Sequence, residues 1–267
     1  MPAGASVVST SLADWHAAIQ RALQATNANR VGALAQVILR RLPRHLATYQ
    51  QLLHTTWLLR RWEEGEDWGR RLLRADPGNA LAWRALAMAA EQRGQRGRAN
   101  ATWQRAFEAH PYEPEIRAGL SRTMLRTTPE NDDGLTLNLA CLAQLYLRGY
   151  RWERAAALYR QLGEADPRRI DFQLGLLAAL WQLRARQEAY ELARQLVQSQ
   201  PYLLIAWAAI DALGDENDKA LARNPIATMD PGGEFVRLWF GLPQENRHIE
   251  LLVSVKEAEL LGDLADA

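Results

Sequence analysis

Residues 80–113 of the 267-residue chain read ALAWRALAMAAEQRGQRGRANATWQRAFEAHPYE and contain two successive helical patterns. Apolar residues recur there at intervals of three or four: Trp83, Leu86 and Ala90, then Ala99, Trp103 and Ala106. Residues at this spacing lie on one face of an α-helix. The stretch therefore predicts two amphipathic helices in succession, each with one face to bury.

Proline spacing extends this pair of helices into a repeat. Pro43, Pro77 and Pro111 are 34 residues apart, and Pro167 and Pro201 repeat the interval. A period of 34 residues is the length of a tetratricopeptide unit, a helix–turn–helix with proline near its end. The interval predicts such units on both sides of a break between Pro111 and the next group.

The residues within these units resemble the tetratricopeptide repeat family. Residues 80–113 and 136–169 match the family pattern best. Their matching positions are Trp83, Leu86, Ala87, Ala99, Trp103, Ala106 and Pro111, and then Leu139, Leu142, Ala143, Tyr146, Ala155, Tyr159, Leu162 and Pro167. Three weaker repeats keep the same frame: residues 12–45, 46–79 and 170–203. The resemblance covers most of residues 12–214.

This resemblance implies an all-α fold, an α-solenoid of tetratricopeptide-type helix pairs wound into a right-handed superhelix. The apolar pattern supports stacking independently, because a pair of helices with one buried face each cannot cover that surface alone. Small residues at Gly65, Ala99, Ala155 and Ala189 permit close packing within each pair.

The repeat frame divides the chain into six segments. They are a flexible N-terminus (1–11), three repeats (12–113), an irregular helix and loop junction (114–135), two further repeats (136–203), a final repeat-like helix (204–214) and a non-repeat tail (215–267). In the junction, a helix at 115–126 either packs directly on the helix near Leu142 or pairs with it as an irregular hairpin. We favour the hairpin, because an exposed apolar face at the break would be costly.

The tail has its own turn signals, at Asn224-Pro225 and at residues 230–233, and a predicted helix at 248–261. Its simpler role is to cap the apolar end of the solenoid, because terminal repeats need covering. Its alternative role is a hook for a partner, with the aromatic residues of an apolar segment as anchors: Phe235, Trp239 and Phe240.

Charge and cysteine content restrict the cellular setting. The 32 Lys and Arg residues nearly balance the 31 Asp and Glu residues, so no long-range field favours nucleic acid or an acidic membrane. The single cysteine, Cys141, fits a reducing compartment. Neither a secretory signal nor an apolar run of about 18 residues is found, so we expect a cytoplasmic protein without membrane insertion.

No group of residues forms a catalytic or metal-binding pattern. The five histidines are scattered, and none lies in an HExxH, CxxC or glycine-rich phosphate motif. Cys141 lies in an apolar run, which is typical of a buried cysteine. We therefore expect a protein that is not an enzyme and that has no cofactor and no metal.

The family resemblance implies that certain first-helix positions line a concave groove. In this sequence these positions are His16, Gln20, Gln50, His54, Trp57, Arg84, Met88, Glu91, Gln144, Leu147, Asp171 and Trp181. Gln51, Leu81 and Ala85 replace the polar and basic residues with which chaperone-binding relatives hold a C-terminal carboxylate. This difference argues against chaperone C-terminal tails as ligands.

The sequence predicts a non-catalytic scaffold or adaptor that holds another protein or a peptide segment in the groove and helps to assemble a larger complex. The alternative is a regulatory module that binds a short peptide or nucleic acid and changes curvature near residues 127–134. Arginine pairs such as Arg70-Arg71 suggest nucleic acid, but acidic residues nearby favour a solvated surface instead.

Overall fold

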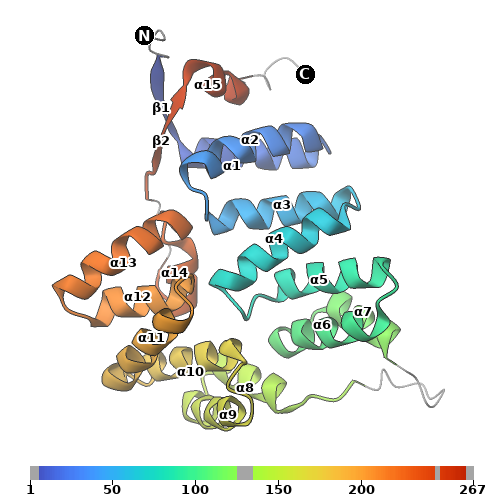
Figure 1. Cartoon of the computed structure of the whole chain (residues 1–267), viewed down its shortest axis with the longest axis vertical. Coiled ribbons are helices and arrows are strands. Elements are labelled where there is room, and N and C mark those ends of the chain that lie inside the picture. The colour runs from blue at the N-terminus through green and yellow to red at the C-terminus, as the bar shows by residue number, and fades with distance from the viewer. Residues whose placement is uncertain (1–5, 125–134, 244–246, 263–267) are drawn as a thin grey trace.

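The computed structural model describes residues 6–124, 135–243 and 247–262, which fold mainly into α-helices (Figure 1). The helices are α1 (Leu12–Gln24), α2 (Ala28–Arg41), α3 (Leu46–Leu58), α4 (Trp62–Ala75), α5 (Ala80–Gln92), α6 (Arg96–Ala109), α7 (Pro114–Thr123), α8 (Leu139–Arg148), α9 (Trp152–Ala165), α10 (Ile170–Gln182), α11 (Arg186–Ser199), α12 (Leu204–Leu213), α13 (Glu216–Met229), α14 (Glu234–Phe240) and α15 (Val255–Gly262). Two strands, β1 (Val7–Ser11) and β2 (Glu250–Ser254), form a small sheet that was not predicted. The all-α solenoid class is confirmed, with this addition.

Consecutive helices pack as antiparallel pairs of the tetratricopeptide-like kind. The pairs are α1–α2, α3–α4, α5–α6, α8–α9, α10–α11 and α12–α13. Helices α1, α3, α5, α10 and α12 begin at the first residue of the corresponding repeat-like segment expected from the sequence, whereas α8 begins three residues into the segment 136–169. No helix in the described ranges combines the length and the apolarity that a membrane span requires.

A hydrogen bond to the backbone carbonyl of the proline recurs in the turns between units. In the turn between units, the proline carbonyl oxygen accepts a hydrogen bond from the side chain six residues later. The donors, in chain order, are Tyr49 Oη to Pro43, Trp83 Nε1 to Pro77 (2.8 Å), Arg117 Nη1 to Pro111 (3.3 Å), Gln173 Nε2 to Pro167 (3.1 Å) and Trp207 Nε1 to Pro201 (2.9 Å). These bonds satisfy a turn carbonyl and join the turn to the first helix of the next unit.

A glycine in the first helix of a unit lets it approach the aromatic residue of the preceding unit. A Cβ added at Gly119 would lie 2.4 Å from the Trp103 ring, and one at Gly175 would lie 2.4 Å from the Tyr159 ring. Helix α7 thus stacks on α6 as α10 stacks on α9. The lone helix of the junction therefore occupies the place of a regular first helix.

The junction differs from the hairpin that we favoured. Helices α7 and α8 both pack on α6 rather than chiefly on each other. The Asn138 amide at the start of α8 donates to Glu108 Oε1 (2.8 Å), and Cys141 is buried in the same core as Trp103 and Leu120. Both apolar faces are covered by α6, which removes the reason for a hairpin. The predicted loop at 127–134 lies outside the described residues.

The helices form two arms, α1–α7 and α8–α14, and the chain closes them at one end. Strands β1 and β2 pair antiparallel, with Val8 opposite Val253. In Figure 1 this sheet and α15 lie beside the first helix pair. The segment predicted to be flexible at 1–11 contains strand β1, and the helix predicted at 248–261 begins only after strand β2. Both predictions are wrong at the residues of these strands. The reason is long-range pairing, which buries the alternate residues Leu251 and Val253 on α1 and α2.

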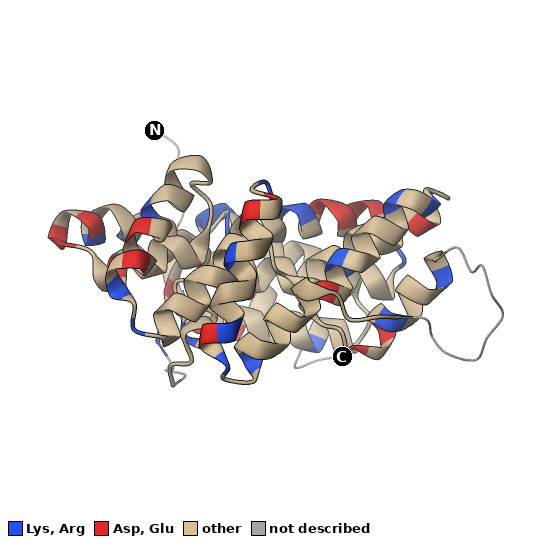
Figure 2. Cartoon of the chain, turned by 90° about the horizontal axis from the view of Figure 1, so that it is seen from below, with Lys and Arg blue, Asp and Glu red and all other residues tan. Residues whose placement is uncertain are grey.

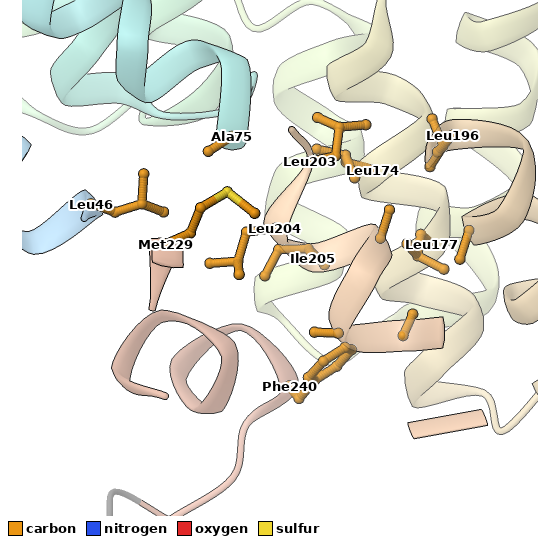
Figure 3. Packing of buried hydrophobic residues seen from close by; sticks show 14 of the residues in the cluster. Leu46, Ala75, Leu174, Leu177, Leu196, Leu203, Leu204, Ile205, Met229 and Phe240 are labelled. Atoms are coloured by element: carbon orange, nitrogen blue, oxygen red, sulfur yellow. The ribbon is translucent and has the colours of Figure 1, made fainter. Parts of the chain in front are cut away.

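A second contact between the arms lies at the end of α13. Figure 3 shows Met229 between Leu46 and Ala75 of the first arm and Leu204 of the second. The prediction that residues after 214 leave the repeat is wrong for α13, which pairs with α12 and contains Pro225 in its interior. A capping box at Asp215 starts this helix, and packing on α12 offsets the hydrogen bond that proline removes.

Replacement of Gly119 or Gly175 by alanine tests the stacking of units. We expect either change to lower the free energy of unfolding by about 1–3 kcal/mol, because the added methyl must displace an aromatic ring. Gly97→Ala in α6 and Gly163→Ala in α9 are matched controls with open space at the Cβ. These should raise stability by roughly 0.5–1 kcal/mol through helix propensity. Urea unfolding measures all four, and equal effects on both sets would contradict the packing.

Candidate partner-binding site

A cavity of about 560 Å³ lies between the two arms and corresponds to the concave groove of the sequence prediction. Five of the predicted groove residues line it: Gln50 and Arg84 from the first arm, and Gln144, Leu147 and Asp171 from the second. The tail completes the wall with Trp239 of α14. The cavity thus combines apolar, amide and charged side chains from three parts of the chain.

Arg84 is the cation of the first wall. Its guanidinium pairs with Glu115 and lies 4.3 Å from the centre of the Trp57 ring. Its Nε and the indole Nε1 of Trp57 are buried and find no hydrogen-bond acceptor among the described residues. Both atoms are closed to solvent, and Trp57, a predicted groove residue, supports Arg84 without lining the cavity itself.

The second wall is held by its own polar network. Asp171 accepts hydrogen bonds from Arg105 (2.9 Å) and from both Nε and Nη2 of Arg169 (3.0 and 2.7 Å). The Oε1 atom of Gln144 accepts from Tyr159 Oη (2.7 Å). These contacts fix the side chains before any ligand arrives, which reduces the entropy cost of binding.

Titratable groups at the cavity edge are shifted by their surroundings. Burial, and then the Arg148 charge, lower the pKa of His110 to about 4, so this ring is neutral near pH 7. Burial raises the pKa of Asp76, whereas hydrogen bonds from Asn79 and Gly78 act in the opposite direction. The described part of the chain contains no group of three or more His, Cys, Asp or Glu residues placed to hold a metal ion.

Several predicted groove residues do not line the cavity. Glu91 accepts hydrogen bonds from Trp103 Nε1 (2.9 Å) and Arg122 (3.2 Å), and Met88 packs in the same apolar core. His54 meets the edge of the Trp57 ring, with centres 5.0 Å apart. Met88 and Glu91 thus contact the neighbouring unit of the same arm, whereas His54 is exposed beside Trp57 of its own helix. None of the three lines this cavity, and their role in partner binding stays a prediction.

The first repeat also lies away from the cavity. His16 stacks on His45 with ring centres 5.1 Å apart, and Gln20 is exposed on α1. Because the arms close at this end, α1 faces α3 and the sheet instead of open groove. His16 and Gln20 therefore do not line this cavity, and their role in partner binding stays a prediction.

The tail anchors divide between packing and the cavity. Phe240 is buried on Trp181, with ring centres 4.1 Å apart, and Phe235 is partly buried against the same core. The hook interpretation is therefore wrong for Phe240, and Trp181 contacts the tail of its own chain. Only Trp239 reaches the cavity. This packing corresponds to the capping role that the sequence suggested for the tail.

Sequence reasoning missed the cavity residues that lie in turns. His110 and Glu113 follow α6, and Arg148 ends α8. The repeat frame assigns groove residues to first helices alone, so these positions carried no family signal. The available clue was position: His110 directly precedes the repeat proline Pro111, Glu113 follows it by two residues, and Arg148 ends a helix.

Comparison with known proteins gives little beyond this geometry. No protein-family model matches the chain, and no curated protein matches it. Among solved structures, a chain in the structure of Naa15/Naa10 bound to HypK-THB is 16% identical over 88% of this chain, with a TM-score of 0.33. The match spans 44% of that chain, and we draw no functional conclusion from it.

The stacked histidines predict a loss of stability on mild acidification. Burial lowers the pKa of His16 to about 4 and, with the His16 charge, that of His45 to about 3. Between those values and 6.5 the unfolded chain binds protons that the folded chain does not, so stability falls as the pH falls. From pH 7 to pH 5 we expect a loss of roughly 2 kcal/mol for each histidine.

The matched variant for this prediction is His16→Gln with His45→Gln. It should flatten the decrease in the free energy of unfolding between pH 7 and pH 5, measured by urea titration. A pH dependence as steep as that of the wild type would show that these rings titrate normally in the folded chain.

Proposed function

We propose that this protein is a non-catalytic scaffold of the tetratricopeptide family that holds an extended segment of a partner protein in the cavity between its arms. The observation that carries the proposal is the cavity between the arms, where Arg84, amide side chains and apolar residues from both arms and the tail face one space. A peptide supplies carbonyl oxygens and amide hydrogens along its whole length, which can pair with the charged and amide side chains of this lining.

The size and lining of the cavity suit such a ligand. Its volume of about 560 Å³ falls within the range of roughly 300–1,000 Å³ that is typical of ligand sites. Leu147 and Trp239 offer apolar contact, and Gln50 and Gln144 offer amides. This mixture resembles a peptide-binding surface, in which main-chain hydrogen bonds give affinity and side-chain contacts give specificity.

The charged groups of the cavity favour binding over catalysis. Asp171 is engaged by two arginines, and His110 contacts Arg148 rather than a hydroxyl or thiol. A general base needs a nucleophile or substrate proton within hydrogen-bond reach. We therefore propose that the protein contributes to assembly by holding a partner, and we propose no reaction for it.

A phage-displayed library of linear peptides, panned on the purified chain, provides the test. Gln50→Trp places a large ring in the cavity, at a side chain for which no described hydrogen bond is lost. We expect selected peptides to lose at least tenfold in affinity for this variant, measured by fluorescence anisotropy.

Gln20→Trp is the matched control, because Gln20 is exposed on α1, away from the cavity. It should bind the selected peptides within twofold of the wild type. Failure of the library to enrich any peptide, or equal binding by both variants, would contradict the proposal. Thermal unfolding of both variants shows that they are folded.

A further inference from the structure

A second cleft, of about 630 Å³, lies on the other side of the contact between the arms. Four arginines line it: Arg44 before α3, and Arg70, Arg71 and Arg74 on α4. The opposite edge is formed by Tyr202, in the turn before α12, and by Met229 at the end of α13. The cleft therefore crosses the seam that closes the molecule.

The arginines of this cleft carry unbalanced positive charge. Arg70 pairs with Glu66 (2.5 Å) and approaches Asp67 (3.6 Å). Arg44, Arg71 and Arg74 make no ion pair with any residue in the described ranges, and all three are exposed. On the helices visible in Figure 2, acidic and basic residues are interspersed. Several cations in one concave site repel one another until an anion binds.

Two of these guanidinium groups are held in place by aromatic rings. Arg44 lies 4.4 Å from the centre of the Tyr202 ring, and Arg71 lies 4.7 Å from that of Trp68. Stacking fixes each planar group while its N–H edges stay available, which is the arrangement for bidentate contact with a carboxylate. The donors are thus positioned before a ligand binds.

We propose that this cleft binds an acidic peptide segment, a run of aspartate and glutamate side chains from a partner protein. The buried floor of the cleft is apolar, with Leu46, Ala75 and Met229, so it also accepts an aliphatic side chain within such a run. This surface is separate from the cavity of the proposed function.

Single-stranded nucleic acid fits the cleft less well. Binding without sequence preference requires open aromatic faces on which bases stack. Here arginines already cover the faces of Tyr202 and Trp68, and Tyr49 is buried under Arg71.

The test uses a fluorescein-labelled peptide of eight alternating aspartate and glutamate residues. The wild type should bind it, and affinity should fall as salt rises from 50 to about 200 mM. The same peptide with asparagine and glutamine should bind at least tenfold more weakly. Oligo-dT of similar charge serves as the nucleic-acid probe.

Arg44→Ala with Arg74→Ala should weaken binding of the acidic peptide at least tenfold. Arg151→Ala with Arg223→Ala removes the same charge from exposed positions outside the cleft, and should stay within twofold of the wild type. Equal loss in both pairs would reduce the effect to net charge and overturn the proposal. Tighter binding of oligo-dT, lost with the cleft variant, would also overturn it.

Two further measurements separate this site from the central cavity. Gln50→Trp should leave affinity for the acidic peptide unchanged, whatever its effect on library-selected peptides. The acidic peptide should raise the melting temperature of the wild type but not of the cleft variant, because it bridges α4 and the turn at Tyr202. A loss of acidic-peptide binding in Gln50→Trp would overturn the assignment to the cleft.

Discussion

Each helix pair of this protein has an apolar face that only a neighbour can cover, and the outermost pairs have a neighbour on one side only. The C-terminal tail covers apolar surface in both arms. Its strand β2 and helix α15 cover α1 and α2, with Leu251 and Val253 fully buried, and Phe240 of α14 covers Trp181 in the second arm. Because the same short segment reaches both arms, covering the ends also closes the molecule.

Closure determines which surfaces remain for a partner. A groove open along its length would expose every first helix, including α1. In the closed form α1 faces α3 and the sheet, and the concave surface shrinks to the cavity that α3, α5 and α7 line with α8, α10 and α14. The same closure brings Tyr202 opposite the arginines of α4 and so creates the basic cleft. Both proposed sites thus depend on contacts between distant parts of the chain.

The sequence predicted the local features well, because helical repeats are determined by the spacing of residues that are near one another in the chain. Helix starts at Leu46, Ala80 and Ile170 follow from the proline interval. The turn within each pair was harder to predict. A positive φ, which favours glycine, recurs at the same position of five repeats, but only one of these residues is a glycine, Gly94. The others are Thr26, Arg60, Tyr150 and Arg184. The β1–β2 pairing joins residues 241 positions apart, and no periodic pattern encodes it. For the same reason Gln50, Arg84, Gln144 and Asp171 could be predicted, whereas the turn residue His110 could not.

Disulfide trapping of the sheet tests closure in solution most directly. Ser9 and Leu252 lie directly opposite each other and are exposed, so Ser9→Cys with Leu252→Cys should form an intramolecular disulfide under mild oxidation. Val7→Cys with Glu250→Cys is the control, because these residues are out of register and should stay reduced. Faster migration of the first pair alone on a non-reducing gel is the predicted result. Disulfide-linked dimers, or no difference between the two pairs, would contradict a closed monomer.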